Sequence, residues 1–276
     1  MPKNPLAPPT DNELLKSYLS HFSLRAIGNK RDLLHRLAKT FAFLPYENLT
    51  KAIRIADEGS PERARRDPKQ VLQDHFSTKT GGTCFSLSAT LIYLIRSLGW
   101  NAEPILANRK YGDNTHSAII VWIDQRPHLL DPGYLIVDPL PLDLEEPQKI
   151  ETSFNELILS PQRKGDEVVL HTVQQGKRTY RLTFKTQPVD AGDFLKVWDS
   201  SFGWDMMRYP VLTQVRGKEQ YYLQENRIQI RNHKEVRHQK IETDEMVQQI
   251  VACFGVGREI VARAIDILKK GDSRFK

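Results

Sequence analysis

The sequence contains little cysteine and no long hydrophobic run. Only two of its 276 residues are cysteines, Cys84 and Cys253, which is too few for a disulfide framework or a structural zinc site. No window approaches the run of about 18 apolar residues that a membrane-spanning helix needs. The N-terminal segment has no apolar stretch of the signal-peptide type. These absences predict a cytoplasmic protein with no membrane partner.

Glycine and proline are also scarce, with 15 and 16 residues, while charged residues make up 27% of the chain. This composition excludes collagen, low-complexity and wholly disordered chains. A chain of this length corresponds to one or two domains at about 150 residues each. It is also long enough to bury a sizeable core without disulfides or metals.

The sequence has no glycine-rich nucleotide-binding motif of the P-loop or dinucleotide type. Its net charge of +6 is compatible with nucleic acid, a membrane surface or a phosphorylated ligand. The cations are scattered, however, apart from a cluster at residues 63–66, and no recognition motif accompanies them. We therefore interpret them as a solvated surface and expect no nucleic-acid partner. His233 and His238 have no cysteine partners, so we expect no metal site.

Helical periodicity dominates the first third of the chain. Apolar residues at helical spacing predict helices near 14–19 and 30–43, the second of which ends before Pro45. The most apolar run covers residues 84–98 and has more than one apolar face, which is typical of a buried central helix. Gly99 ends this run.

Beyond Gly99 the apolar residues alternate with polar ones, which is typical of strands. The pattern predicts a hairpin over 117–131 that turns at Asp124-Gln125, a second hairpin over 168–184, and terminal helices after residue 244. Helices, antiparallel strands and mixed structure in that order indicate an α+β fold. We expect an N-terminal helical bundle at 1–98, a central antiparallel β-barrel-like domain at 99–195, and a C-terminal α/β lid at 196–276.

Cys84 lies at the start of the predicted central helix, directly after Gly81-Gly82-Thr83. The free N–H groups and the dipole of a helix N-terminus lower the pKa of a cysteine. Glycines allow close approach of a substrate and leave main-chain N–H groups that could hold an oxyanion. Cys84 is therefore a candidate nucleophile, which requires a base and a group that orients the base.

His116 and Asp131 are the candidates for these two roles. His116 opens the first strand of the predicted 117–131 hairpin, and Asp131 ends its second strand. Both residues are at a similar distance from the turn, so the hairpin would place them nearly opposite each other. The alternatives are a buried structural cysteine, a satisfied polar histidine and a turn-forming aspartate. A single triad explains all three positions together.

These residues resemble a known family, the arylamine N-acetyltransferases. The family has an arginine-glycine-glycine-x-cysteine turn that opens a helix, a histidine on a strand, and an aspartate followed by x-glycine-aromatic. The matching positions are Gly81 to Cys84, His116, and Asp131-Pro132-Gly133-Tyr134. A family signature of proline-phenylalanine-glutamate-asparagine-leucine is matched by Pro45-Tyr46-Glu47-Asn48-Leu49, and the likeness runs weakly to the C-terminus.

The resemblance implies a papain-like core, related to cysteine proteases and transglutaminases, and a cytoplasmic transferase. It further implies that Cys84 takes an acetyl or other acyl group from acetyl-CoA or another acyl-CoA as co-substrate and passes it to an amine by a ping-pong mechanism. His116 would act as base and Asp131 would orient it. We also expect contacts with substrate from the flanking residues Gly82, Thr83, Gly133 and Tyr134. Cys253 is interpreted as a core residue of an amphipathic helix.

The chain departs from the family pattern at three positions beside the nucleophile. Thr80 replaces the arginine before the diglycine, and Ser86 and Ser88 replace a glutamate and an asparagine. Loss of the arginine together with the glutamate predicts that an ion pair is missing there without leaving an unpaired charge. An alternative is thus a transglutaminase-like thiol hydrolase or amide synthase acting on a peptide or natural product. A catalytically silent binding protein is a third hypothesis. Donor, acceptor and oligomeric state stay open.

Overall fold

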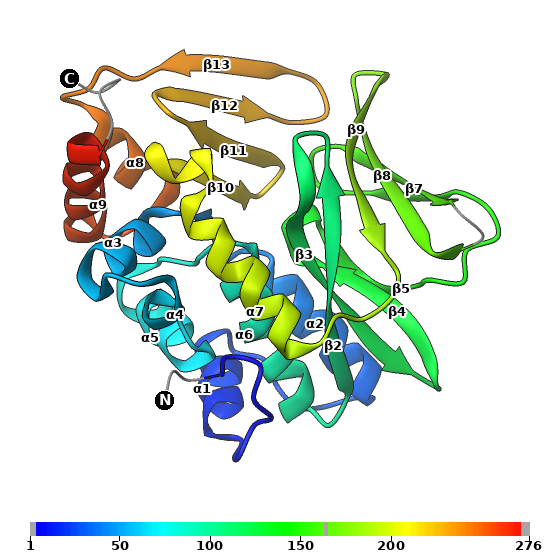
Figure 1. The fold of residues 1–276 in the computed structure, drawn as a ribbon. Helices are drawn as coiled ribbons and strands as arrows, with labels where there is room; N and C mark the ends of the chain where they lie inside the picture. The colour runs from blue at the N-terminus through cyan, green and yellow to red at the C-terminus, as the bar shows by residue number, and fades with distance from the viewer. Residues whose placement is uncertain (1–3, 163–164, 272–276) are drawn as a thin grey trace.

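The structure is a computed structural model that describes residues 4–162 and 165–271. Helices occupy one side of the molecule, a strongly curved sheet occupies the other, and a second sheet with two helices completes the fold (Figure 1). Along the chain, helices come first, antiparallel strands follow, and the C-terminal part is mixed. The predicted α+β class is confirmed.

The helices carry most of the N-terminal third and return near the C-terminus. Within the described residues the α-helices are α1 (Glu13–His21), α2 (Lys30–Phe41), α3 (Leu49–Glu58), α4 (Pro61–Ala64), α5 (Pro68–Thr78), α6 (Cys84–Ser97), α7 (Ala191–Ser200), α8 (Met246–Phe254) and α9 (Arg258–Gly271). None of these helices has both the length and the apolar character that a membrane crossing requires.

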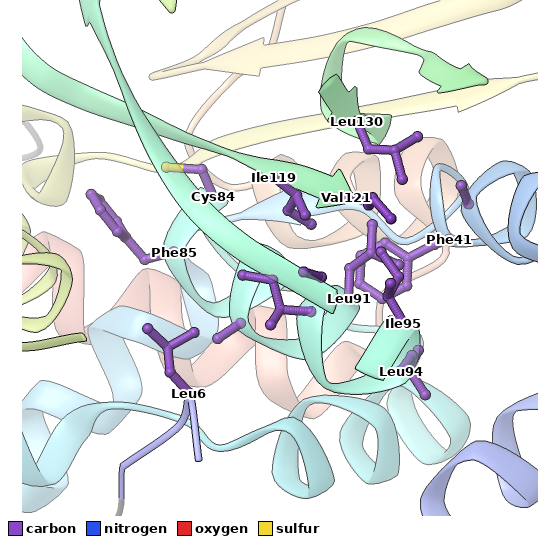
Figure 2. Close-up of a cluster of buried hydrophobic side chains, with 14 of the residues drawn as sticks. Leu6, Phe41, Cys84, Phe85, Leu91, Leu94, Ile95, Ile119, Val121 and Leu130 are labelled. Atoms are coloured by element: carbon purple, nitrogen blue, oxygen red, sulfur yellow. The ribbon is translucent and has the colours of Figure 1, made fainter. Parts of the chain in front are cut away.

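Helix α6 is the central helix of the N-terminal part. Ten of its 14 residues are buried, so the helix is packed on more than one face, as its apolar run predicts. Its side chains join those of α2 and of strand β3 (Gly112–Ile123) in one hydrophobic core. Figure 2 shows Cys84 at the edge of this core, and Leu91 and Ile95 deeper along the helix.

The curved sheet contains eight antiparallel strands and forms a nearly closed barrel (Figure 1). Alternate side chains of its strands face two different cores, which explains the period of two in the sequence. In β3, Ala118 and Ile120 face the barrel interior, while Ile119 and Val121 pack against α6. The other strands are β2 (Asn101–Arg109), β4 (Arg126–Asp131), β5 (Ile136–Pro141), β6 (Gln148–Glu151), β7 (Glu156–Gln162), β8 (Glu167–Gln174) and β9 (Lys177–Lys185), in the spatial order β5-β4-β3-β2-β9-β8-β7-β6.

The second sheet has five antiparallel strands in the order β1-β10-β11-β12-β13. Its first strand comes from the N-terminal part of the chain, and the outermost strand exposes four of its five residues to solvent. The strands are β1 (Tyr46–Glu47), β10 (Val211–Arg216), β11 (Glu219–Gln224), β12 (Arg227–Arg231) and β13 (Val236–Lys240).

The N-terminal helices and the C-terminal part share a hydrophobic core. Leu49, Ala52 and Ile53 of α3 are buried together with side chains of β10–β12, α8 and α9. The strand pairing of β1 with β10 reinforces this contact. The domain boundaries predicted at 98/99 and 195/196 stay predictions. The predicted N-terminal helical part and the predicted C-terminal part are packed against each other.

The diglycine before α6 is held against the segment that contains β1. The Glu47 N–H donates to the Gly82 carbonyl at 2.9 Å, and the Gly82 N–H donates to the Pro45 carbonyl at 3.3 Å. A Cβ on Gly81 would lie 1.9 Å from the carbonyl oxygen of Pro45. Position 81 therefore requires glycine for steric reasons, because the neighbouring atom belongs to the backbone.

Replacing Gly81 by alanine should destabilise the protein by more than about 3 kcal/mol, the upper end of ordinary overpacking costs, because the clash involves backbone atoms. Urea unfolding measures the loss. Gly203→Ala is the matched control, since a Cβ there meets nothing within 4 Å. Equal stability of the two variants would contradict the packing described for Gly81.

Candidate active site

Cys84 is the first residue of α6 and follows the N-cap residue Thr83. Its residue exposure is 7%, and Figure 2 places its sulfur at the border of the hydrophobic core. The N-terminal end of a 14-residue helix supplies free N–H groups and a positive partial charge. Sequence and structure therefore agree on the local environment of this thiol.

His116 and Asp131 meet on neighbouring strands of the barrel. The His116 Nε2 atom lies 2.6 Å from Asp131 Oδ2, and both residues are buried. The β3–β4 register pairs Ile119 with Leu130, and its continuation sets Asp131 opposite Ala118 rather than His116. The two side chains are thus diagonal neighbours on one face of the sheet, still within contact distance.

A break in the strand register helps to aim the carboxylate of Asp131. The pairing of β4 with β5 shifts between Leu129 and Asp131, and such irregularities redirect side chains. The short 3-10 helix η1 (Pro132–Tyr134) follows directly. The ring of Tyr134 packs edge-on against His116, with 5.5 Å between ring centroids.

Charges around Cys84 oppose the effect of its burial. Burial raises the pKa of the Cys84 thiol, but the hydrogen bond to His116 and the positive charges of His116, Arg109 and Lys51 lower this pKa below its ordinary value. Burial likewise lowers the pKa of His116, and the Asp131 carboxylate outweighs it and brings this pKa to about 9. The lowered pKa of Cys84 and the raised pKa of His116 both shift the pair toward a thiolate beside an imidazolium.

Two cationic side chains near Cys84 and His116 were not among the site residues predicted from the sequence. They are Arg109 and Lys51. Arg109 Nη2 donates to His116 Nδ1 at 3.1 Å. Lys51 is buried in α3, donates to Ser201 Oγ at 2.5 Å, and lies over the Phe202 ring. Burial lowers the pKa of Lys51 to about 7, although the negative charges of Cys84 and Asp199 raise it. A buried cation of this kind stabilises a nearby thiolate.

Replacing Lys51 by methionine should slow iodoacetamide labelling of Cys84 at pH 7 by roughly threefold, because a charge that favours the thiolate is lost. It should also stabilise the fold. In the unchanged protein, Lys51 is protonated in both the folded and the unfolded state below pH 7. Between pH 7 and about 10 only the unfolded state keeps the proton, so the cost of burying the charge falls as pH rises. The gain measured by urea unfolding should therefore be larger at pH 6 than at pH 9. A gain that increases with pH would contradict this assignment.

Asn48 connects the nucleophile turn to the C-terminal sheet. Its side chain donates to the carbonyls of Met206 and Tyr209 at 2.7 and 2.8 Å and accepts from the Val211 N–H at 2.9 Å. The preceding residue, Glu47, is fully buried, and its N–H binds the diglycine. Glu47 and Asn48 therefore join the signature at 45–49 to two other segments of the chain, through backbone groups of Gly82 and of residues 206–211.

Arg66 supplies a guanidinium next to the diglycine, although position 80 is a threonine. Its Nη1 donates to the Gly81 carbonyl at 2.7 Å and to Thr50 Oγ1 at 2.8 Å. Thr50 Oγ1 in turn donates to Glu47 Oε1 at 2.6 Å. The Arg66 and Glu47 charges are 3.9 Å apart. A different ion pair, Arg66 with Glu47, therefore lies beside this turn, and the loss of a pair at positions 80 and 86 stays a prediction.

Replacing Arg66 by methionine should destabilise the protein by about 3–5 kcal/mol, because a buried carboxylate loses its charge partner. Burial already raises the pKa of Glu47, so the carboxyl can take up a proton as pH falls. The loss should thus be larger at pH 8 than at pH 5, as urea unfolding would measure. Arg63→Met is the control, because Arg63 is exposed and binds only the Glu58 carbonyl. Equal losses in both variants would disprove this role.

Two cavities meet at the triad. The first, of about 70 Å³, is mainly apolar, and its walls come from α2, α6, β3, β4 and β10. The second, of about 410 Å³, lies between the barrel and the C-terminal sheet. Four residues line both cavities: Tyr46, His116, Gly133 and Thr213. The candidate catalytic residues therefore lie between an apolar pocket and a larger cleft.

The larger cleft is positively charged. Its walls include Arg109, Lys110, Arg181 and Arg231, and none of its lining residues is acidic. Arg181 and Arg231 bond to neutral oxygens, on Thr172 and Gln220 respectively. Burial and the neighbouring Arg181 lower the pKa of Arg231 to about 10. These uncompensated cations make the cleft suitable for an anionic ligand.

The structure divides the four predicted substrate-contacting residues into two pairs. Gly133 and Tyr134 line the charged cleft. Gly82 and Thr83 are buried in the turn before α6, and the Gly82 N–H is already used by Pro45. Contact of all four with substrate stays a prediction.

The second cysteine is far less perturbed by charges than the first. Cys253 of α8 is half-buried and packs at the margin of the core shared by α3, α8 and α9. Burial raises its pKa, and Arg216 lowers it only in part. Within residues 4–162 and 165–271, no three histidine, cysteine or acidic side chains come together as metal ligands.

Comparisons with known proteins agree with this fold. The chain resembles the arylamine N-acetyltransferase of Mycobacterium abscessus with 15% identity and a TM-score of 0.76, covering 95% of this chain and 99% of that one. The Mycobacterium marinum enzyme, solved in complex with CoA, is 18% identical with a TM-score of 0.72 (92% and 99% covered). A Bacillus cereus enzyme described as having a Cys-His-Glu triad is 12% identical with a TM-score of 0.69 (89% and 99%). No curated sequence matches the chain.

The fold of the chain is that of these N-acetyltransferase structures. The N-acetyltransferase family model matches residues 32–260, which is most of the chain. This protein belongs to the N-acetyltransferase family and is an N-acetyltransferase enzyme, as the sequence motifs predict.

Proposed function

We propose that Cys84, His116 and Asp131 are the catalytic triad of a ping-pong acyl transfer from acyl-CoA to an amine. The observation that carries this proposal is the 2.6 Å contact between His116 and Asp131, beside a buried thiol whose pKa the same histidine lowers. Asp131 lies at Nε2, so the thiol proton would pass to Nδ1, which in the neutral ring accepts the hydrogen bond from Arg109. This arrangement supplies a nucleophile, a base and an orienting carboxylate.

In the first half-reaction, His116 takes the thiol proton and the Cys84 thiolate attacks the thioester carbonyl of acyl-CoA. The tetrahedral intermediate collapses, the bond from the carbonyl to the CoA sulfur breaks, and CoA leaves with the proton from His116. An imidazolium has no lone pair to accept the Arg109 hydrogen bond. Arg109 therefore contacts Nδ1 only while His116 is neutral, and it is free for another acceptor once the histidine is charged.

In the second half-reaction, an amine attacks the acyl-cysteine and His116 accepts the amine proton. Collapse of the intermediate breaks the bond from the carbonyl to Sγ and regenerates the Cys84 thiol. Asp131 keeps the ring in one orientation and stabilises its positive charge in both halves. The product is an N-acylated amine.

The charged cleft is the side from which acyl-CoA would reach the thiol. Arg109 binds His116, and Lys110, Arg181 and Arg231 line the same cleft. Guanidinium groups without carboxylate partners bind phosphate oxygens well. The CoA complex of the M. marinum relative supports acetyl-CoA or another acyl-CoA as co-substrate. The arylamine enzymes among the structural relatives support a small-molecule amine as acceptor.

The test is intact-protein mass spectrometry after mixing with acetyl-CoA alone. We expect an increase of roughly 42 Da, the mass of one acetyl group on a covalent intermediate, which disappears when an arylamine or hydrazine is added. Cys84→Ser and His116→Ala should abolish the rapid adduct, while the matched control Cys253→Ser should retain it. In parallel, limiting iodoacetamide near neutral pH should label Cys84 before Cys253, because its pKa is lower.

Two results would overturn the proposal. An adduct that persists in Cys84→Ser would move the nucleophile elsewhere. Absence of any adduct with a panel of CoA thioesters, with Cys84 still reactive toward iodoacetamide, would instead favour a transglutaminase-like hydrolase or amide synthase with the same triad.

A further inference from the structure

We propose that the apolar pocket beside Cys84 binds the acyl chain of the donor and selects chains of butyryl size over acetyl. The inference rests on the proposed acyl-cysteine chemistry and specifies the class of its donor. It is drawn from the position, the lining and the size of the 70 Å³ cavity.

The position of the cavity matches the path of an acyl group. It touches Cys84 and His116 on one side and continues between α2, α6 and β3, away from the charged cleft. When a thioester lies with its CoA portion in the cleft and its carbonyl at Cys84, the chain beyond the carbonyl points toward this pocket. Figure 2 shows Phe41, Leu91, Ile119 and Leu130, four of its lining residues, grouped on the same side of Cys84.

The lining of the cavity suits a hydrocarbon chain. Apart from Cys84, His116 and Asp131, no lining residue has an ionised side chain near neutral pH. The hydroxyl of Ser88 is already engaged with the Ser117 carbonyl at 3.2 Å. The remaining walls include five leucines, one isoleucine, one valine and one phenylalanine, so the main favourable contribution is burial of apolar surface.

Two small side chains create the space. Ser88 projects from α6 one turn beyond Cys84, and Ser117 follows His116 in β3; both line the cavity. A larger residue at either position would fill it. Ser88 is also one of the positions at which this chain departs from the family pattern, so the pocket is a feature of this chain's own sequence.

The volume sets the length of the chain. A cavity of about 150 Å³ holds benzene, which has six carbons, so a 70 Å³ cavity corresponds to about three carbons beyond the carbonyl. An aryl ring does not fit without enlargement, which assigns the pocket to the acyl group rather than to the ring of an arylamine acceptor. An acetyl group would leave most of the space empty.

The experiment compares rates of acyl-enzyme formation for acetyl-, butyryl- and octanoyl-CoA, followed by stopped reactions and intact mass. A methylene group in a fitting apolar pocket changes specificity by about 10–200-fold, so butyryl-CoA should acylate Cys84 at least about tenfold faster than acetyl-CoA. Octanoyl-CoA should be slower than butyryl-CoA. Benzoyl-CoA should also be slower than butyryl-CoA, because its ring exceeds the pocket.

Two variants should shift the preference in opposite directions. Ser88→Leu fills the pocket and should lower the butyryl-to-acetyl rate ratio at least about tenfold. Leu87→Ala removes a lining side chain of intermediate exposure and should raise the octanoyl-to-butyryl ratio. The matched controls are Thr90→Val, which does not line the pocket, and Leu98→Ala, a half-buried leucine at the far end of the same helical run. Both controls should keep the ratios of the unchanged protein.

The failure of this inference is distinguishable from failure of the proposed function. Absence of any adduct, acetyl included, overturns the acyl-cysteine chemistry itself. Normal acetylation with rates that fall steadily from acetyl to butyryl to octanoyl, unchanged in ratio by Ser88→Leu and Leu87→Ala, overturns only the acyl pocket. If a variant fails to fold, the other variant and the chain-length series of the unchanged protein still decide the question.

Discussion

The site depends on a buried network of hydrogen bonds that joins three distant segments of the chain. Glu47 binds the Gly82 carbonyl, and Asn48 binds the backbone of the segment that leads into β10. Buried backbone groups without partners are costly, so these contacts fix the position of the turn that begins α6. The orientation of Cys84 toward the barrel therefore depends on residues of the 45–49 signature that take no part in the proposed chemistry.

Opposing electrostatic effects act on the buried thiol of Cys84. A buried thiolate alone would be costly, and a buried imidazolium alone would be costly too. Together, and with Asp131 on the far side of the ring, each charge has a partner of opposite sign. Lys51 and Arg109 add positive charge around the same sulfur. The reactivity proposed for Cys84 would consequently be a property of the whole group of charges, and no single residue would account for it.

Local sequence patterns were sufficient to predict the parts of the site that are encoded locally. The position of Cys84 followed from a diglycine before an apolar helical run, and the proximity of His116 to Asp131 followed from the length of one hairpin. The exact cross-strand partner was not predictable, because the register shift at Asp131 depends on the neighbouring strand β5. The predicted α+β class and the hairpin of β8 and β9 are present for the same local reasons.

Features that arise only from tertiary packing were not predictable. Arg66 appeared as one member of a surface cluster of cations, whereas in the fold it is 4% exposed and binds the Gly81 carbonyl. Lys51 gave no sequence signal, because its environment is made by Ser201 and Phe202, about 150 residues away. The pairing of the two-residue strand β1 with β10 has the same origin. A substitution such as arginine to threonine at position 80 can thus be compensated from a part of the chain that local comparison does not connect to it.

The outermost strand of the C-terminal sheet has a consequence for how the molecule behaves at high concentration. Within the described residues β13 pairs only with β12, so its other edge presents unpaired backbone groups that another chain could extend into a continuous sheet. Its sequence, Val-Arg-His-Gln-Lys, exposes two basic side chains, a histidine and a glutamine along that strand. Both basic side chains are held in ion pairs, Arg237 with Glu219 and Lys240 with Glu242. Bringing two such edges together would bury these charged pairs, and removing charged groups from water is costly. The charged residues of this strand therefore disfavour edge-to-edge pairing of folded molecules.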